Sequence, residues 1–302
     1  MVIRKITRKK FLTTAVAGIA GIKLLSGKIT EGQTGLSGRR NVGKTGIMVS
    51  PVCFGASRTS EESLIRYAID KGLFFIDTGR NYANGNNEKL IGKVVGSFRK
   101  NVVIQSKLRL DPNELPSAGK GKRGAEEIRD LLNSRLEASL KALNTDYIDI
   151  LLYHDATRED LLFHTEVIKF YTGLKDSGVI KANGFSAHND YINLHERNIK
   201  EGIYDVLMVP FNHKGSFIHS VTGRYSEWDQ KRLMEVLKNA GDKGIGIIAM
   251  KTCSGGMYSP VQNLEPNYRE AVRWVLGHPF ISAAAVAMAN FEQVDEHVSW
   301  LT

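Results

Sequence analysis

Residues 102–154 read VVIQSKLRLDPNELPSAGKGKRGAEEIRDLLNSRLEASLKALNTDYIDILLYH, and the pattern of this stretch decides the fold. Two short runs rich in β-branched and aliphatic residues, 102–107 and 147–154, flank a longer segment at 125–143 whose apolar residues keep helical spacing. Strand-like runs joined by an amphipathic helix are typical of a β-α-β unit, in which the two strands lie parallel. The stretch therefore predicts a parallel sheet covered by helices.

The same alternation of strand and helix continues in both directions along the chain. Strand-like runs occur at residues 51–56, 73–77, 102–107, 147–154, 179–186, 204–210, 245–250 and 281–288. Amphipathic segments follow them at residues 60–71, 87–99, 125–143, 160–176, 191–201, 227–242, 265–276 and 291–301. This repetition predicts an α/β fold of the (β/α)8 or TIM-barrel class, with residues 41–302 forming a single domain. An open doubly wound sheet is the alternative, but no GxGxxG motif follows an early strand.

The net charge of +9 comes from the N-terminal part of the 302-residue chain. Residues 1–44 contain ten of the 41 Lys and Arg residues and one of the 32 Asp and Glu residues, so residues 45–302 carry 31 of each sign. A nucleic-acid-binding surface needs basic groups that cluster on the folded domain. We therefore expect no nucleic-acid partner.

The cysteines and histidines argue against a metal centre. Cys53 and Cys253 are too far apart for a CxxC motif, and the eight histidines include no HExxH pair. Structural zinc sites and iron–sulfur clusters need several such ligands at suitable spacing. We expect neither a metal ion nor an iron–sulfur cluster.

Residues 1–40 resemble an export signal followed by a linker. Five basic residues at positions 4–10 precede an apolar stretch at 11–25, which is the layout of a signal peptide. The run TRKKFL resembles the twin-arginine signal, with Lys9 in place of the second arginine. This predicts contact with the export machinery, a periplasmic or otherwise exported protein, and membrane anchoring only if the segment is not cleaved. A basic tail on a cytoplasmic protein is the alternative.

The stretch GRRNVGKT at 38–45 satisfies the phosphate-binding P-loop pattern GxxxxGK[ST]. A P-loop follows a buried strand and opens a helix. Here the mostly polar residues 28–37 come before the motif, and a strand-like run at 47–54 comes after it. We therefore interpret 38–45 as a hairpin turn.

Polar side chains occur where three of the predicted strands end. Asp77 ends the second strand and Tyr82 lies in the loop after it, while Lys107 and His154 end the third and fourth strands. Because the carboxyl ends of barrel strands meet at one rim, we expect these side chains to lie together. A lysine that is paired with Asp77 can stay charged and stabilise a tyrosine phenolate near neutral pH. His154 can then orient a carbonyl oxygen toward Tyr82.

This pattern resembles the aldo-keto reductase family. The spacing Asp77-x4-Tyr82 within FIDTGRNYANGNNEKLIGK, together with Lys107 and His154, matches the four site residues of that family in order. The segments VGKTGIMVSPVCFG, GVIKANGFS and ANFEQVDE are also similar, so the resemblance covers about residues 41–302. It implies a barrel that uses NADPH or NADH to reduce a small aldehyde or ketone to an alcohol. Tyr82 would be the general acid, tuned by Lys107 and Asp77, and His154 would position the substrate.

The resemblance also assigns cofactor-binding positions, several of which depart from the family pattern. Ser186 matches a serine that contacts the nicotinamide amide, but Met208 stands where a glutamine usually holds the same amide. Met250 replaces the aromatic ring that usually stacks on the nicotinamide. Lys251 and Thr252 are placed to reach the pyrophosphate.

The last strand and the start of the helix after it bear on the choice between NADP and NAD. The family commonly places Lys and Arg here on the adenosine 2′-phosphate, whereas this chain has Ala287, Met288 and Gln293, with Asn290 as a polar contact. A phosphate needs cations or several hydrogen-bond donors. The resemblance therefore implies use of NAD, or of both nucleotides, rather than strict use of NADP.

Two other functions remain open from the sequence. The altered nicotinamide contacts favour a barrel that binds a nucleotide with little catalysis, as a sensor or auxiliary subunit. A hydrolase or lyase that uses Asp155 or Glu88 with His154 is the other. Nucleotide binding without turnover would identify the first, and activity without a nicotinamide would identify the second.

Overall fold

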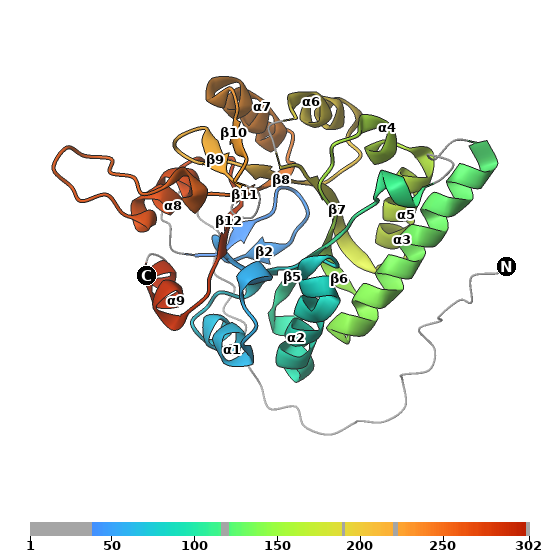
Figure 1. Ribbon diagram of the computed structural model, residues 1–302, viewed down its shortest axis with the longest axis horizontal. Helices are drawn as coiled ribbons and strands as arrows, with labels where there is room; N and C mark the ends of the chain where they lie inside the picture. The colour runs from blue at the N-terminus through green and yellow to red at the C-terminus, as the bar shows by residue number, and fades with distance from the viewer. Residues whose placement is uncertain (1–37, 116–120, 189–190, 220–222, 300–302) are drawn as a thin grey trace. The chain divides into compact units, whose positions relative to one another are not determined.

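The computed structural model describes residues 38–115, 121–188, 191–219 and 223–299. In this part of the chain, parallel strands close into a barrel in the order β3-β4-β5-β6-β7-β8-β11-β12, and β12 pairs with β3 (Figure 1). The strands are β3 Val52–Gly55, β4 Phe75–Asp77, β5 Val103–Leu108, β6 Ile148–Tyr153, β7 Ile180–Ser186, β8 Val206–Pro210, β11 Gly246–Met250 and β12 Ala283–Ala287. Each overlaps one predicted strand, which confirms the (β/α)8 fold. The predicted signal segment lies almost entirely outside the described residues.

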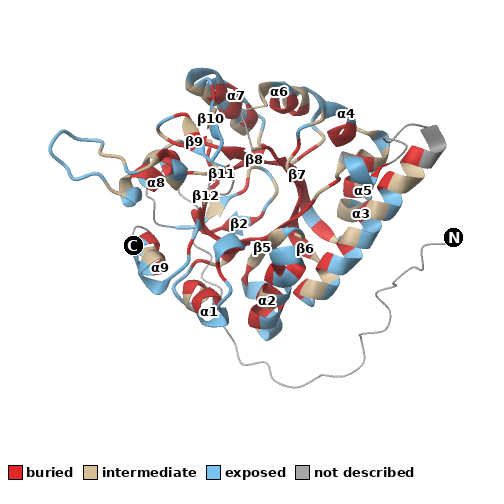
Figure 2. Cartoon of the chain, in the orientation of Figure 1, coloured by how far each residue is buried: buried red, intermediate tan, exposed pale blue. Residues whose placement is uncertain are grey.

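Helices surround the barrel, and Figure 1 shows them on its outer side. They are α1 Glu62–Asp70, α2 Asn86–Val95, α3 Gly121–Leu143, α4 Glu159–Leu162, α5 Thr165–Asp176, α6 Ile192–Glu201, α7 Gln230–Asp242, α8 Tyr268–Leu276 and α9 Phe291–Val298. Figure 2 shows the strands as the most deeply buried part and the outer faces of the helices as exposed. In α3, Ile128, Leu132 and Leu136 are buried at helical spacing, as an apolar stripe packed on a sheet should be. None of the helices among the described residues has the length and apolar character needed to cross a membrane.

Capping side chains explain where the helices depart from the predicted boundaries. The run predicted as one helix at 160–176 forms α4 and α5, because the His164 side chain accepts a hydrogen bond from the Glu166 amide and starts a new helix. Asp229 and Asn267 cap α7 and α8 in the same way, so these helices begin later than predicted.

Two hairpins accompany the barrel. The stretch with the P-loop pattern forms an antiparallel hairpin of β1 Arg40–Asn41 and β2 Met48–Val49, which confirms its interpretation as a turn. Val42, Ile47 and Val49 of this hairpin share a buried apolar cluster with the barrel interior, so the hairpin closes the amino-terminal end of the barrel. The second hairpin, β9 Ser216–Ile218 and β10 Tyr225–Glu227, follows β8 and was not predicted.

Close packing of α2 on α3 gives a test of the fold. A Cβ at Gly92 would lie 2.5 Å from the Ala142 carbonyl oxygen, whereas a Cβ at Gly173, in the middle of α5, would meet nothing within 4 Å. We expect Gly92→Ala to lower the free energy of unfolding by about 1–3 kcal/mol through overpacking. Gly173→Ala should raise it by about 0.5–1 kcal/mol, since alanine restricts the unfolded chain. Urea titration measures both, and equal effects of the two substitutions would contradict the packing of α2 on α3.

Candidate active site

The side chains predicted to form the site come together at the carboxyl ends of neighbouring strands. Asp77 is the last residue of β4, Lys107 lies near the end of β5, and His154 directly follows β6. Tyr82 begins a short 3-10 turn, Tyr82–Gly85, in the loop after β4. In TIM barrels this rim carries the chemistry, while the opposite end contributes to stability.

The Lys107 ammonium is the centre of this cluster. Lys107 Nζ lies 2.6 Å from Asp77 Oδ1, 2.7 Å from the Thr78 carbonyl oxygen and 3.1 Å from the Tyr82 hydroxyl. Lys107 is 1% exposed and Asp77 is 4% exposed, so water takes almost no part in these contacts. The ammonium thus donates to three acceptors in a dry site, where hydrogen bonds to charged groups are strong.

Burial and charge set the protonation states of these groups. Burial by itself would lower the pKa of Lys107, but the charges of Asp77 and Tyr82 and their hydrogen bonds outweigh it and raise that pKa to about 12. Burial raises the pKa of Tyr82 above its ordinary value, and the Lys107 charge offsets only part of this effect. At neutral pH the site therefore holds a charged lysine and a protonated tyrosine. The Lys107 charge lowers the pKa of Tyr82, as the sequence led us to expect, but burial, which the sequence does not reveal, has the larger effect.

His154 completes the cluster as a neutral side chain. Its ring lies 5.9 Å from the Tyr82 ring, at an interplanar angle of 76°, and 5.9 Å from the His188 ring. Burial, followed by the charge of Lys107, lowers the pKa of His154 well below its ordinary range. A neutral imidazole beside a protonated tyrosine can donate a hydrogen bond to the same substrate oxygen without adding a charge.

Gln105 is a site residue that the sequence analysis missed. Its Nε2 donates to Asp77 Oδ1 over 2.6 Å and contacts Met208 Sδ at 3.4 Å. Gln105 is fully buried inside the barrel, two positions before Lys107 on β5. The alternation of side chains along a strand places Gln105 and Lys107 on the same inward face, which is the signal that could have identified it.

A cleft of about 490 Å³ leads away from Asp77 and Tyr82. It runs between the ends of β3, β11 and β12 and reaches α8 and α9. The predicted cofactor residues on its wall are Met208, Met250, Lys251, Thr252 and Gln293, while Gly55, Ser57, Arg58, His188, Cys253, Ser254, Tyr268, Ala285, Val286, Ala287, Glu296 and His297 also line it. The lining combines thioethers, which suit contact with a nicotinamide ring, with hydroxyl and cationic groups, which suit phosphates.

Ser186 and Asn290, the other predicted cofactor residues, are not among the residues that line this cleft. The Ser186 hydroxyl accepts a hydrogen bond from the Asp155 amide at 3.1 Å. The Asn290 side chain caps α9 by accepting from the Gln293 amide. Both side chains therefore accept hydrogen bonds from backbone amides of the protein.

Arg58 supplies a cation that the sequence analysis did not assign to the cleft. It lies in the 3-10 turn Ala56–Arg58 that follows β3 and lines the same cleft as Gln293 and Glu296. Arg58 follows the first barrel strand, far in sequence from residues 287–293, so the residues of the last strand give no sign of this cation. The position of Arg58 just beyond a strand end was the available signal.

The residues of the hydrolase or lyase alternative have different surroundings. Glu88 is fully buried on α2 and accepts from Arg80 at 2.6 Å and from the Ser106 hydroxyl at 2.7 Å. Glu88 is not among the residues that line the cleft. Asp155 follows His154 and lies 3.5 Å from Arg109 in an ion pair. Both carboxylates are thus paired with arginines, which does not favour a general base.

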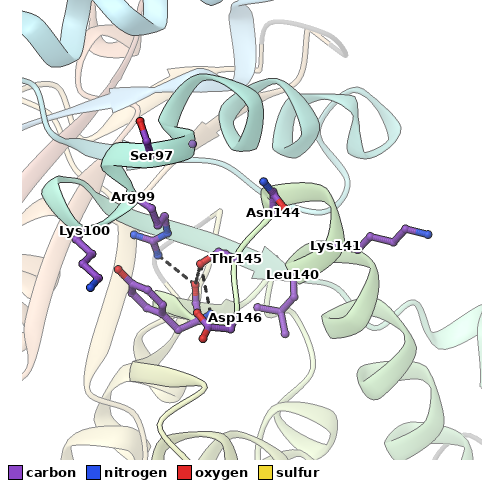
Figure 3. Close-up of a pocket in the computed structure, with 10 residues that line it drawn as sticks. Ser97, Arg99, Lys100, Leu140, Lys141, Asn144, Thr145 and Asp146 are labelled. Atoms are coloured by element: carbon purple, nitrogen blue, oxygen red, sulfur yellow. Dashed lines mark hydrogen bonds between the residues drawn. The ribbon is translucent and has the colours of Figure 1, made fainter. Parts of the chain in front are cut away.

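A hollow of about 770 Å³ lies at the opposite end of the barrel, next to the start of β5 and β6. Figure 3 shows Lys100 and Lys141 on its wall, extending in different directions. Arg99 is held by Asp149 and by the carbonyl oxygens of Val102 and Tyr147. The hollow therefore lacks the convergent polar groups found at the opposite rim. No group of three His, Cys, Asp or Glu side chains suited to hold a metal ion occurs among the described residues.

Comparisons with known proteins agree with this geometry. The sequence profile described as "Aldo/keto reductase family" matches residues 54–273. An uncharacterized oxidoreductase of Bacillus subtilis, YrpG, is 28% identical over 72% of this chain and 66% of its own length. The L-galactose dehydrogenase of Arabidopsis thaliana is 24% identical over 87% of this chain and 88% of its own length. The chain spans less than two thirds of the length of several other curated relatives. It covers 48% of the uncharacterized oxidoreductase YqkF and 37% of the aldo-keto reductase YhdN, both of Bacillus subtilis.

Solved structures give the same result for the fold. An aldo-keto reductase structure from Pseudomonas aeruginosa superposes with a TM-score of 0.65 and 25% identity, covering 87% of this chain and 93% of that one. An aldo-keto reductase of Bacillus halodurans gives a TM-score of 0.66 with 20% identity, over 87% of this chain and 90% of that one. Together with the profile match over most of the barrel, these findings show that the chain belongs to the aldo/keto reductase family.

Proposed function

We propose that this protein reduces the carbonyl group of a small aldehyde or ketone to an alcohol, with NADPH or NADH as the reductant. The observation that carries the proposal is the buried Lys107 ammonium, which contacts both Asp77 and the Tyr82 hydroxyl. This arrangement holds a proton donor next to a fixed positive charge at the inner end of a cleft. A bound reduced nicotinamide would supply the hydride for the carbonyl carbon.

The chain's own residues provide the proton. Tyr82, protonated at neutral pH, donates its hydroxyl proton to the carbonyl oxygen as that oxygen gains negative charge. The phenolate that remains is stabilised by the Lys107 ammonium at 3.1 Å. Asp77 keeps Lys107 charged, and neutral His154 donates a hydrogen bond that orients the oxygen. The alcohol leaves and the phenolate is reprotonated from solvent.

The cleft suits a dinucleotide without selecting strictly between NADPH and NADH. Met208 and Met250 offer apolar contact at the inner end, and Thr252 and Lys251 add a hydroxyl and an ammonium to the lining. Arg58 and Lys251 are the cationic side chains among its described lining residues. We assign both to the pyrophosphate, which the two nucleotides share.

Replacement of Tyr82 tests the proposed chemistry. Tyr82→Phe removes the proton donor and one of the three acceptors of Lys107, so kcat for aldehyde reduction should fall by about 10²–10⁴-fold. The Kd for NADPH, followed by nicotinamide fluorescence, should stay unchanged. Tyr225→Phe, at an exposed tyrosine of β10, is the matched control. Wild-type turnover in Tyr82→Phe would refute the proposed role, and nucleotide binding without turnover in the unaltered protein would support the sensor alternative.

Replacement of Arg58 tests the assignment of the phosphate contact. Arg58→Gln removes one charge-assisted hydrogen bond at a solvent-accessible site, so the Kd values of NADH and NADPH should each rise by about tenfold. Lys200→Gln, at an exposed position on α6, should change neither value. Fluorescence titration of each variant with NADH and with NADPH measures these Kd values. A loss confined to NADPH would show that Arg58 binds the 2′-phosphate, contrary to the assignment.

We also propose that the protein is exported through its N-terminal segment. The basic residues at 4–10 and the apolar stretch at 11–25 support this proposal. The full chain, expressed in a bacterium with a twin-arginine route, should appear in the periplasmic fraction. Arg8→Lys should keep it in the cytoplasm. Cytoplasmic location of both forms would contradict export and favour a cytoplasmic protein with a basic tail.

A further inference from the structure

The ion pair between the partly buried Arg80 and the fully buried Glu88 lies outside the proposed proton transfer. Arg80 Nη1 is 2.6 Å from Glu88 Oε2, and the exposed fractions of the two side chains are 18% and 0%. Burying an ion pair is costly unless good geometry and further hydrogen bonds compensate. This ion pair has the compensating geometry and lies next to the loop that carries Tyr82, which suggests that it stabilises the conformation of that loop.

The turn that carries Tyr82 has an unfavourable backbone. Ala83, Asn84 and Gly85 follow it with φ angles of 47°, 53° and 82°. In the left-handed region the Cβ of residues other than glycine crowds the following carbonyl oxygen. Asn84 tolerates this region better than most residues, but Ala83 persists there only where surrounding contacts hold it.

Arg80 makes several of these contacts. Its guanidinium donates to the Asn84 carbonyl oxygen at 3.5 Å and to the Ala138 carbonyl oxygen of α3 at 3.2 Å. Its own amide donates to the Lys107 carbonyl oxygen at 3.0 Å. A Cβ at Gly85 would overlap the Arg80 guanidinium, so the turn and this side chain are closely packed. Arg80 thus ties the turn to α3 and β5.

Glu88 connects the same turn to the strand of the lysine. While one carboxylate oxygen binds Arg80, Oε1 accepts from the Ser106 hydroxyl at 2.7 Å. Ser106 precedes Lys107 on β5. A single buried carboxylate therefore fixes the spacing between the element that carries Tyr82 and the element that carries Lys107.

We propose that Arg80, acting through Glu88, is a positioning residue that keeps the Tyr82 hydroxyl in hydrogen-bond contact with Lys107. The inference rests on the proposed role of Tyr82 as proton donor. Neither Arg80 nor Glu88 is among the residues that line the cleft, so the pair acts on the geometry of the proton donor. Lysine at position 80 would keep the charge but lose the planar fork that reaches several acceptors at once.

Kinetics of Arg80→Gln across a range of pH test the proposal. A displaced donor should lower kcat by about 10–100-fold, while KM for the aldehyde and Kd for NADPH stay unchanged. Contact with Lys107 stabilises the phenolate, so its loss raises the pKa of Tyr82 further. The alkaline limb of the kcat profile should then move to higher pH. Partial unfolding would reduce the amount of active protein without moving this limb.

Three further variants serve as controls. Arg80→Gln combined with Glu88→Gln leaves no uncompensated buried carboxylate, and it should show the same shifted limb while folding normally. Arg80→Lys should recover part of the lost kcat. Arg135→Gln alters another arginine with 18% side-chain exposure, paired with Glu114 at 2.5 Å, and should have wild-type kinetics.

The Tyr82→Phe background separates failure of this inference from failure of the proposed function. There, Arg80→Gln should cause no further loss of the residual rate, because the group that it positions is gone. Wild-type turnover in Tyr82→Phe would overturn the proposed function and this inference with it. If Tyr82→Phe is inactive but Arg80→Gln and the double variant keep the wild-type kcat and alkaline limb, the positioning role alone is overturned.

Discussion

The ion pair between Lys107 and Asp77 is the interaction on which the site depends. An ammonium with 1% of its surface exposed would lose its proton unless its surroundings replaced the water that it lacks. Asp77 and the Thr78 carbonyl oxygen do this at 2.6 and 2.7 Å, which leaves the Tyr82 hydroxyl as the third acceptor. The lysine therefore stays charged at neutral pH, and its ammonium is directed at the Tyr82 hydroxyl.

The barrel brings the two partners of this ion pair together because β4 and β5 are adjacent and in a fixed register. Asp77 pairs with Gln105 across the two strands, and Gln105 adds a second donor to the same carboxylate oxygen. Lys107 then lies one inward position farther along β5. Removing one partner of a buried pair typically costs about 3–5 kcal/mol, so the contacts of the site also contribute to the stability of the rim.

The sequence predicted the parts of the structure that depend on periodicity. Alternating strand-like and helical runs identified the barrel, and the rule that barrel strands end at one rim brought Asp77, Lys107 and His154 together. The hairpin at 38–45 followed from its polar and strand-like neighbours. These features are local, so they can be recognised without knowing how distant segments pack.

Features that depend on packing between distant segments could not be predicted from the sequence. The contribution of Arg58 to the cleft results from the closure of the first barrel strand against the last. Asn84 and Gly85 are common in turns, but no residue preference signals the left-handed conformation of Ala83, which lies beside the contacts that Arg80 makes to Asn84 and to α3. The raised pKa of Tyr82 depends on its burial, which the spacing Asp77-x4-Tyr82 does not show.

A single-turnover experiment tests the central claim most directly. Protein lacking residues 1 to about 40 is loaded with NADPH or NADH and mixed with a reactive aromatic aldehyde, and the nicotinamide absorbance is followed while the alcohol is quantified. The account predicts loss of absorbance matched by one equivalent of alcohol for each bound nucleotide. Stable absorbance from a bound nucleotide in the presence of excess aldehyde would contradict it.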